Sequence, residues 1–117
     1  MDLIFFDLDG TLLNDASEIS SFTKDTLILL GEKNIAYTVA TGRTMLSAQR
    51  ILDGHVFELP QIYNNGMITY DPKIQQLTLE NLLNHAEIST IVDVAIKQGI
   101  APFVNTIDND QHHYMFH

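Results

Sequence analysis

The 117-residue chain has no cysteine, few basic residues and no long apolar run. Without cysteine there can be no disulfide, no thiolate zinc site and no cysteine nucleophile. No apolar run approaches the roughly 20 residues that a membrane-spanning helix needs. Asp2 also stands where a signal peptide would carry positive charge. We therefore expect a cytoplasmic protein with no membrane partner.

Acidic residues outnumber basic ones by 15 to 6, which gives a net charge of −9. A nucleic-acid partner is not expected, because binding one requires a basic face. A phosphate-bearing substrate would meet an acidic protein, so a bound divalent cation would have to reverse the local field. Hydrophobic residues make up 45% of the chain, enough for a core. The length predicts one domain, or one domain and part of another.

The chain is organised around its first strand and the acidic turn after it. The apolar run Leu3–Phe6 predicts a strand buried on both faces, as in a parallel sheet. Asp7 and Asp9 follow at the carboxyl end, where open α/β sheets place ligand chemistry. The two carboxylates would repel each other unless a cation lay between them or one held a proton. Gly10 permits a left-handed turn, and Gly10-Thr11 can direct N–H groups towards an anion.

Periodicity then predicts alternating strands and helices. We expect a first helix from Ser20 or Ser21 to about residue 31, a strand at 35–40, a helix at 44–52 and a strand at 59–65. A strand–helix–strand unit is right-handed by default, with its strands parallel, so Asp7 and Thr41 should lie side by side at one sheet edge.

The pattern changes to α+β in the second part. We expect a hairpin of residues 67–70 and 74–79, a helix at 87–98, a strand at 102–107, a turn at 108–110 and a partner strand from residue 111. These elements predict two domains, 1–82 and 83–117.

The sequence Asp-Leu-Asp-Gly-Thr-Leu at residues 7–12 resembles the DxDGT[LV] signature of the haloacid dehalogenase-like (HAD) hydrolases. The resemblance implies an α/β fold with a Rossmann-like parallel three-layer core. It also implies that Asp7 is the nucleophile that forms an aspartyl-phosphate and that Asp9 is the general acid/base. Mg²⁺ would be held by the Asp7 carboxylate and the Asp9 backbone carbonyl. The alternative is a buried strand that ends in a solvated acidic turn.

Two later stretches fit the same family. Thr41 matches the Ser or Thr that binds the phosphoryl group, and Thr41-Gly42-Arg43 precedes a helix whose N-terminus suits an anion. Arg43 could contact phosphate or cap structure, and both alternatives stay open. Asn65, in Asn65-Gly66, resembles the loop that borders the family's phosphate site; the alternative is a plain hairpin turn.

The order of elements from residue 62 to 79 is similar to that of the Cof-like HAD phosphatases, so residues 83–117 would begin an inserted α+β cap. The family's lysine and its Gly-Asp-x-x-x-Asp pair are not found: Lys73 and Lys97 lack the right context, and Asp follows neither Gly54 nor Gly99. The resemblance therefore implies the N-terminal part of a Mg²⁺-dependent phosphatase for small phosphorylated metabolites such as sugar phosphates, weakly active or inactive alone. The alternatives are a phosphomutase and a non-catalytic module.

Two further expectations concern surfaces. The first strand would be central in the family's sheet, so here it should leave an open edge that another copy or a partner fragment covers. Near the end of the chain several histidines and aspartates gather, which could form a metal site but fit a solvated hairpin better: His112, His113, His117, Asp108 and Asp110.

Overall fold

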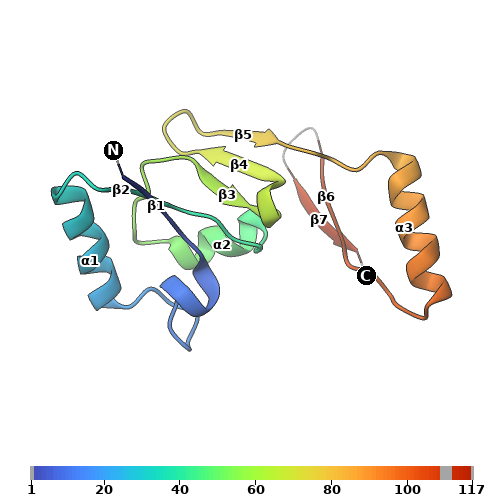
Figure 1. The fold of residues 1–117 in the computed structure, drawn as a ribbon, viewed down its shortest axis with the longest axis horizontal. Helices are drawn as coiled ribbons and strands as arrows, with labels where there is room; N and C mark the ends of the chain where they lie inside the picture. Colours follow the sequence, from blue (N-terminus) through green and yellow to red (C-terminus); the bar gives the residue numbers. More distant parts are fainter. Residues whose placement is uncertain (1, 109–111, 117) are drawn as a thin grey trace. The chain divides into compact units, whose positions relative to one another are not determined.

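The computed structural model describes residues 2–108 and 112–116 (Figure 1). The chain divides into two compact units, one ending at Asn81 and the other beginning at Leu82. Among the described residues, no helix is long and apolar enough to cross a membrane.

The first unit is built on a parallel strand pair with a helical crossover. β1 and β2 pair in parallel, with Leu3 opposite Ala36 and Phe6 opposite Val39. A parallel bridge between Ala40 and the third strand continues this arrangement, and the third strand then begins an antiparallel ribbon with the order β3-β4-β5. The elements are β1 (Leu3–Phe6), a wide turn (Leu8–Leu12), α1 (Ser21–Glu32), β2 (Ala36–Val39), α2 (Met45–Leu52), β3 (Gln61–Tyr63), a short turn (Asn64–Gly66), β4 (Ile68–Asp71) and β5 (Gln76–Leu79).

Side-chain caps fix where the helices begin. The Ser20 hydroxyl accepts from the Thr23 N–H at 3.1 Å, so α1 begins at Ser21. The Thr44 hydroxyl accepts from the Ser47 N–H at 3.3 Å in front of α2. Each cap satisfies an N–H that the helix itself leaves unbonded, and losing one typically costs about 1 kcal/mol.

The core of the first unit joins the acidic turn to the helices and the ribbon. Leu8 and Val39 are fully buried, and Leu27 of α1 is 1% exposed. Tyr63 is also fully buried; its hydroxyl donates to Gln61, and burial raises its pKa to about 12. The other buried apolar side chains are Leu12, Leu13, Ile19, Met45, Ala48, Leu52, Phe57 and Ile68.

The first strand departs from expectation. Leu3 is 48% exposed and Phe5 is 52% exposed, so the prediction that this strand is buried on both faces is wrong. Their side chains share one face of the strand, and β1 has only β2 beside it among the described strands. The apolar run reflects a strand suited to the middle of a sheet, whereas this chain places it at an edge.

The second unit has a helix and a hairpin. α3 (His85–Lys97) is followed by β6 (Val104–Ile107) and β7 (His113–Phe116), which pair antiparallel. No described residue from Leu82 onwards is buried, and the apolar side chains of Ile91 and Val94 are about half exposed. This unit therefore has no core of its own within the described residues.

Several element bounds differ from those predicted. The third helix begins at His85 rather than near residue 87, because Asn84 and Glu87 form a capping box. The Asn84 side chain accepts from the Glu87 N–H at 3.0 Å, and the Glu87 carboxylate accepts from the Asn84 N–H at 2.8 Å. Strands β3, β5 and β6 each begin two residues later than expected. Of the expected turn and partner strand near the C-terminus, residues 109–111 and His117 lie outside the described part.

Candidate active site

The carboxyl ends of β1 and β2 bring Asp7 and Thr41 to one sheet edge. The Ala40 N–H donates to the Phe6 carbonyl at 2.9 Å, which extends the parallel pairing to the last residue before Thr41. Asp7 follows directly on the other strand. The adjacency that the βαβ pattern predicts is therefore present.

Backbone hydrogen bonds join the loop after β2 to the loop after β3. The Thr41 N–H donates to the Ile62 carbonyl at 3.0 Å, and the Asn65 N–H donates to the Thr41 carbonyl at 3.2 Å. The Asn64 N–H donates to the Arg43 carbonyl at 2.9 Å. These bonds hold the Thr41-Gly42-Arg43 segment and the two asparagines in a fixed relation.

Sequence reasoning missed the part that Asn64 plays in this junction. Its side-chain oxygen accepts from the Met45 N–H at 3.2 Å, which ties the start of α2 to the end of β3. Asn64 and Asn65 both have left-handed backbones, with φ of 51° and 54°. Asparagine tolerates that region better than most residues, so the Asn-Asn-Gly sequence contained the signal.

An open cavity of about 420 Å³ lies at this edge. Four predicted site residues line it: Asp7, Thr41, Gly42 and Asn65. Its other lining residues are Ala40, Ile62 and Gly66. Asp9, Gly10, Thr11 and Arg43 were also predicted site residues, but they do not line this cavity.

Gly42 lets Asn65 approach the loop after β2. A Cβ atom added to Gly42 would lie 2.7 Å from the Asn65 side-chain oxygen, which is closer than real Cβ contacts allow. The absence of a side chain at Gly42 therefore sets the place of the Asn65 amide at the cavity wall.

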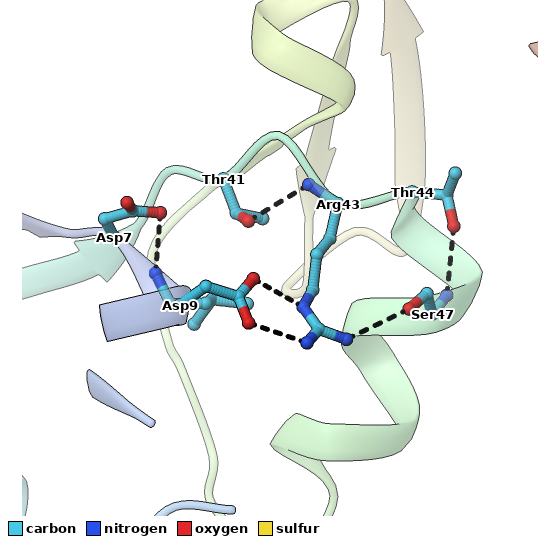
Figure 2. Close-up of polar contacts among 7 residues, drawn as sticks. Asp7, Asp9, Thr41, Arg43, Thr44 and Ser47 are labelled. Carbon is cyan, nitrogen blue, oxygen red and sulfur yellow. Dashed lines mark hydrogen bonds and ion pairs between the residues drawn. The ribbon is translucent and has the colours of Figure 1, made fainter. Parts of the chain in front are cut away.

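Thr41 is 6% exposed and its hydroxyl is already oriented. The oxygen accepts the Arg43 N–H at 3.1 Å (Figure 2). Because that contact uses a lone pair, the hydroxyl proton can still be donated to an acceptor such as a phosphoryl oxygen.

The turn after β1 fixes the carboxylate of Asp7. One carboxylate oxygen accepts the N–H of Leu8 at 2.8 Å (Figure 2). The Asp7 carbonyl accepts the Leu12 N–H at 3.2 Å. Gly10 allows this wide turn with a positive φ of 74°, as predicted. Asp7 thus lines the cavity while its carboxylate and its carbonyl each accept a hydrogen bond from the turn.

Asp9 turns to Arg43, a partner that the sequence analysis did not foresee. Arg43 Nε donates to one Asp9 oxygen and Nη2 to the other, both at 2.7 Å (Figure 2). The hydrogen bonds from Arg43 lower the pKa of Asp9, and the same bonds raise the pKa of Arg43. The two residues are 34 positions apart, so no local pattern could show the pair. The two aspartates were expected to need a cation between them or a proton on one of them. In the structure the Arg43 guanidinium places a positive charge beside Asp9.

A model of the haloacid dehalogenase-like hydrolase family matches residues 4–115, nearly the whole chain. The chain belongs to this family. This match confirms the family that the acidic turn at residues 7–12 resembles. It also confirms the α/β fold expected for a haloacid dehalogenase-like hydrolase.

Curated relatives of this haloacid dehalogenase-like chain are named phosphatases. The 5-amino-6-(5-phospho-D-ribitylamino)uracil phosphatase YwtE of Bacillus subtilis is 29% identical over 93% of this chain and 37% of its own length. An HMP-PP phosphatase of Serratia proteamaculans is 38% identical over 68% of this chain and 29% of its own length. The chain thus spans 29% to 37% of the length of these two curated relatives.

Solved structures show the same fold. A haloacid dehalogenase-like hydrolase from B. subtilis superposes with a TM-score of 0.73 at 24% identity, over 92% of this chain and 36% of that protein. A Thermotoga maritima protein, TM0651, superposes with a TM-score of 0.66 at 29% identity, over 97% of this chain and 41% of that protein.

The donor atoms at the turn suit a hard cation. The Asp7 carboxylate and the Asp9 carbonyl offer oxygen only, and proteins usually hold Mg²⁺ through one or two carboxylates, with substrate phosphates and water completing the shell. The described residues contain no group of three or more acidic, histidine or cysteine side chains placed to hold a metal. The two oxygen donors at the turn are of the kind that Mg²⁺ accepts.

His112 makes local contacts within the hairpin near the C-terminus. Asp108 accepts from the backbone N–H of His112 at 2.9 Å, and its other oxygen lies 3.1 Å from the His112 ring. The Tyr114 hydroxyl also donates to Asp108, at 3.0 Å. The sequence favoured a solvated hairpin over a metal site here, and two of the residues concerned, Asp110 and His117, lie outside the described residues.

Proposed function

We propose that this chain carries the phosphoryl-transfer half-site of a Mg²⁺-dependent phosphatase that hydrolyses small phosphomonoesters. The observation that supports this most is the cavity at the strand ends, where a carboxylate, a buried hydroxyl and an amide side chain converge. A nucleophile and neutral hydrogen-bond donors on one wall suit a phosphoryl group.

In the first step an Asp7 oxygen attacks phosphorus in line with the ester bond. The P–O bond to the alcohol breaks, and Asp9 gives the departing oxygen a proton. The product is a phosphoryl group on Asp7. The Thr41 hydroxyl donates a hydrogen bond to a phosphoryl oxygen, and the Asn65 side chain lies beside the phosphoryl group.

In the second step water attacks the same phosphorus and Asp9 takes a proton from it. The bond to Asp7 breaks, which releases inorganic phosphate and restores the carboxylate. A bound Mg²⁺ would neutralise charge on the phosphoryl group.

We propose a small phosphorylated metabolite, such as a sugar phosphate, as the substrate. The YwtE relative is named for a phosphorylated ribityl compound, which supports this class. The chain spans 37% of that relative, so we expect turnover well below that of a full-length enzyme.

The test is hydrolysis of an aryl phosphate with Mg²⁺ by the chain, by Asp7→Asn and by Asp25→Asn. Asp25 is exposed on α1, so its variant makes the same change of charge away from the cavity. We expect a slow but measurable rate that Asp7→Asn abolishes and Asp25→Asn retains. Equal rates in all three proteins would refute the assignment of Asp7.

A further inference from the structure

The ion pair between Arg43 and Asp9 occupies both oxygens of the proposed acid/base. Two parallel N–H···O bonds of 2.7 Å hold the carboxylate (Figure 2). In this arrangement Asp9 faces a guanidinium rather than the oxygen of an ester. The proposed chemistry therefore requires Arg43 to leave.

Arg43 has a fixed backbone and a long side chain tethered at its tip. Its N–H donates to Thr41 and its carbonyl accepts from Asn64, so the main chain stays beside the cavity. The guanidinium is held by Asp9 and by a longer contact of 3.4 Å to Ser47. The side chain can change direction without disturbing the loop.

The exchange is favourable on grounds of charge and shape. The guanidinium fork matches a phosphate as well as a carboxylate, and a phosphate ester carries more negative charge. The Asp9 side chain is 56% exposed, so solvent and salt screen its attraction to Arg43. The chain has a net charge of −9, so a phosphate in the cavity would be strongly stabilised by a nearby cation such as Arg43.

We propose that Arg43 is shared between Asp9 and the phosphate, pairing with Asp9 in the free chain and moving to a phosphate that enters the cavity. The movement releases Asp9 only when the cavity is filled. Arg43 is then a positioning residue that withholds the acid/base from the solvent-filled site. This inference rests on the proposed function, because it assumes that the cavity binds phosphate.

The arginine side chains can be followed directly by NMR. The chain has two arginines, so Arg50, exposed on α2, serves as the internal reference. With inorganic phosphate as the probe, we expect the Arg43 Nε–H signal to move together with the amide signals of Thr41 and Asn65, while the Arg50 signal stays. Asp9→Asn alone should also move the Arg43 signal.

The possible failures are distinguishable. If phosphate moves the amide signals of Thr41 and Asn65 but leaves the Arg43 side chain in place, the phosphate site stands and the exchange is refuted. If phosphate moves none of these signals, both the site and the exchange fail.

A variant cycle separates competition for the fork from a general effect of charge. Asp9→Asn should bind inorganic phosphate several-fold more tightly than Asp25→Asn, because the arginine no longer has a competitor. That gain should shrink in the Arg43→Lys background, which keeps the charge but lacks the fork. An undiminished gain in that background would mean that charge alone is responsible, and the exchange would be wrong.

Discussion

The site depends on one missing side chain at Gly42. The Cβ of an alanine there would lie 2.7 Å from the Asn65 oxygen, so Gly42→Ala should displace the Asn65 amide from the cavity wall. We expect weaker binding of inorganic phosphate, measured by titration of the amide signals.

Gly31 is the matched control for that substitution. It lies in α1, and an added Cβ would meet nothing within 4 Å. Gly31→Ala should leave phosphate binding unchanged and raise the free energy of unfolding by about 0.5 kcal/mol, since alanine favours the helix. If both variants bound phosphate equally well, Asn65 would have no part in the site.

His55 makes the stability of the first unit depend on pH. Its ring lies 3.0 Å from the Tyr37 hydroxyl and packs edge-on against Phe57. Burial first, and then the charge of Lys24, lower the pKa of His55 below its ordinary value of 6.5. As the pH falls below 6.5 the unfolded chain takes up a proton before the folded chain does, so stability should fall.

Denaturant unfolding at a series of pH values tests this dependence. We expect His55→Gln to reduce the loss of stability below pH 6.5, whereas His85→Gln, an exposed position in the second unit, should not. An identical pH profile for the wild-type chain and His55→Gln would contradict the prediction.

At the scale of elements, α3 depends on its own cap. None of its residues is buried, so the Asn84–Glu87 capping box has little help from packing. Asn84→Ala should weaken the helix by about 1 kcal/mol. Hydrogen exchange of the α3 amides should speed up while that of α1 stays the same; unchanged α3 exchange would show that packing holds the helix.

The sequence predicted elements better than their contacts. Local signals were enough for the acidic turn, for the start of the first helix near Ser20 or Ser21 and for the parallel pairing of the first two strands. The pairing of Asp9 with Arg43 depends on a loop distant in the chain, so the sequence pattern did not contain it. The exposure of Phe5 depends on what lies beside the sheet, which an apolar run cannot show.

At the scale of the whole molecule, β1 has an open edge among the described strands and a half-exposed apolar face. We expect another copy of the chain, or a partner fragment, to cover it. Light scattering should show association of the chain alone, which Phe5→Lys reduces. Phe22→Lys, at an exposed position of α1, is the control; an equal effect of both variants, or a monomeric wild-type chain, would argue against self-association through β1.

The central claim is that Asp7 accepts a phosphoryl group. The most direct test is the intact mass of Asp9→Asn after reaction with an aryl phosphate and Mg²⁺, followed by borohydride reduction to locate the modified residue. An aryl phosphate has a good leaving group, so the first step needs little acid, whereas removal of the phosphoryl group needs Asp9 as base. We predict a gain of one phosphoryl group, placed on Asp7 and absent when Asp7→Asn is added. A phosphoryl group elsewhere, or one that persists in the Asp7→Asn variant, would contradict the account.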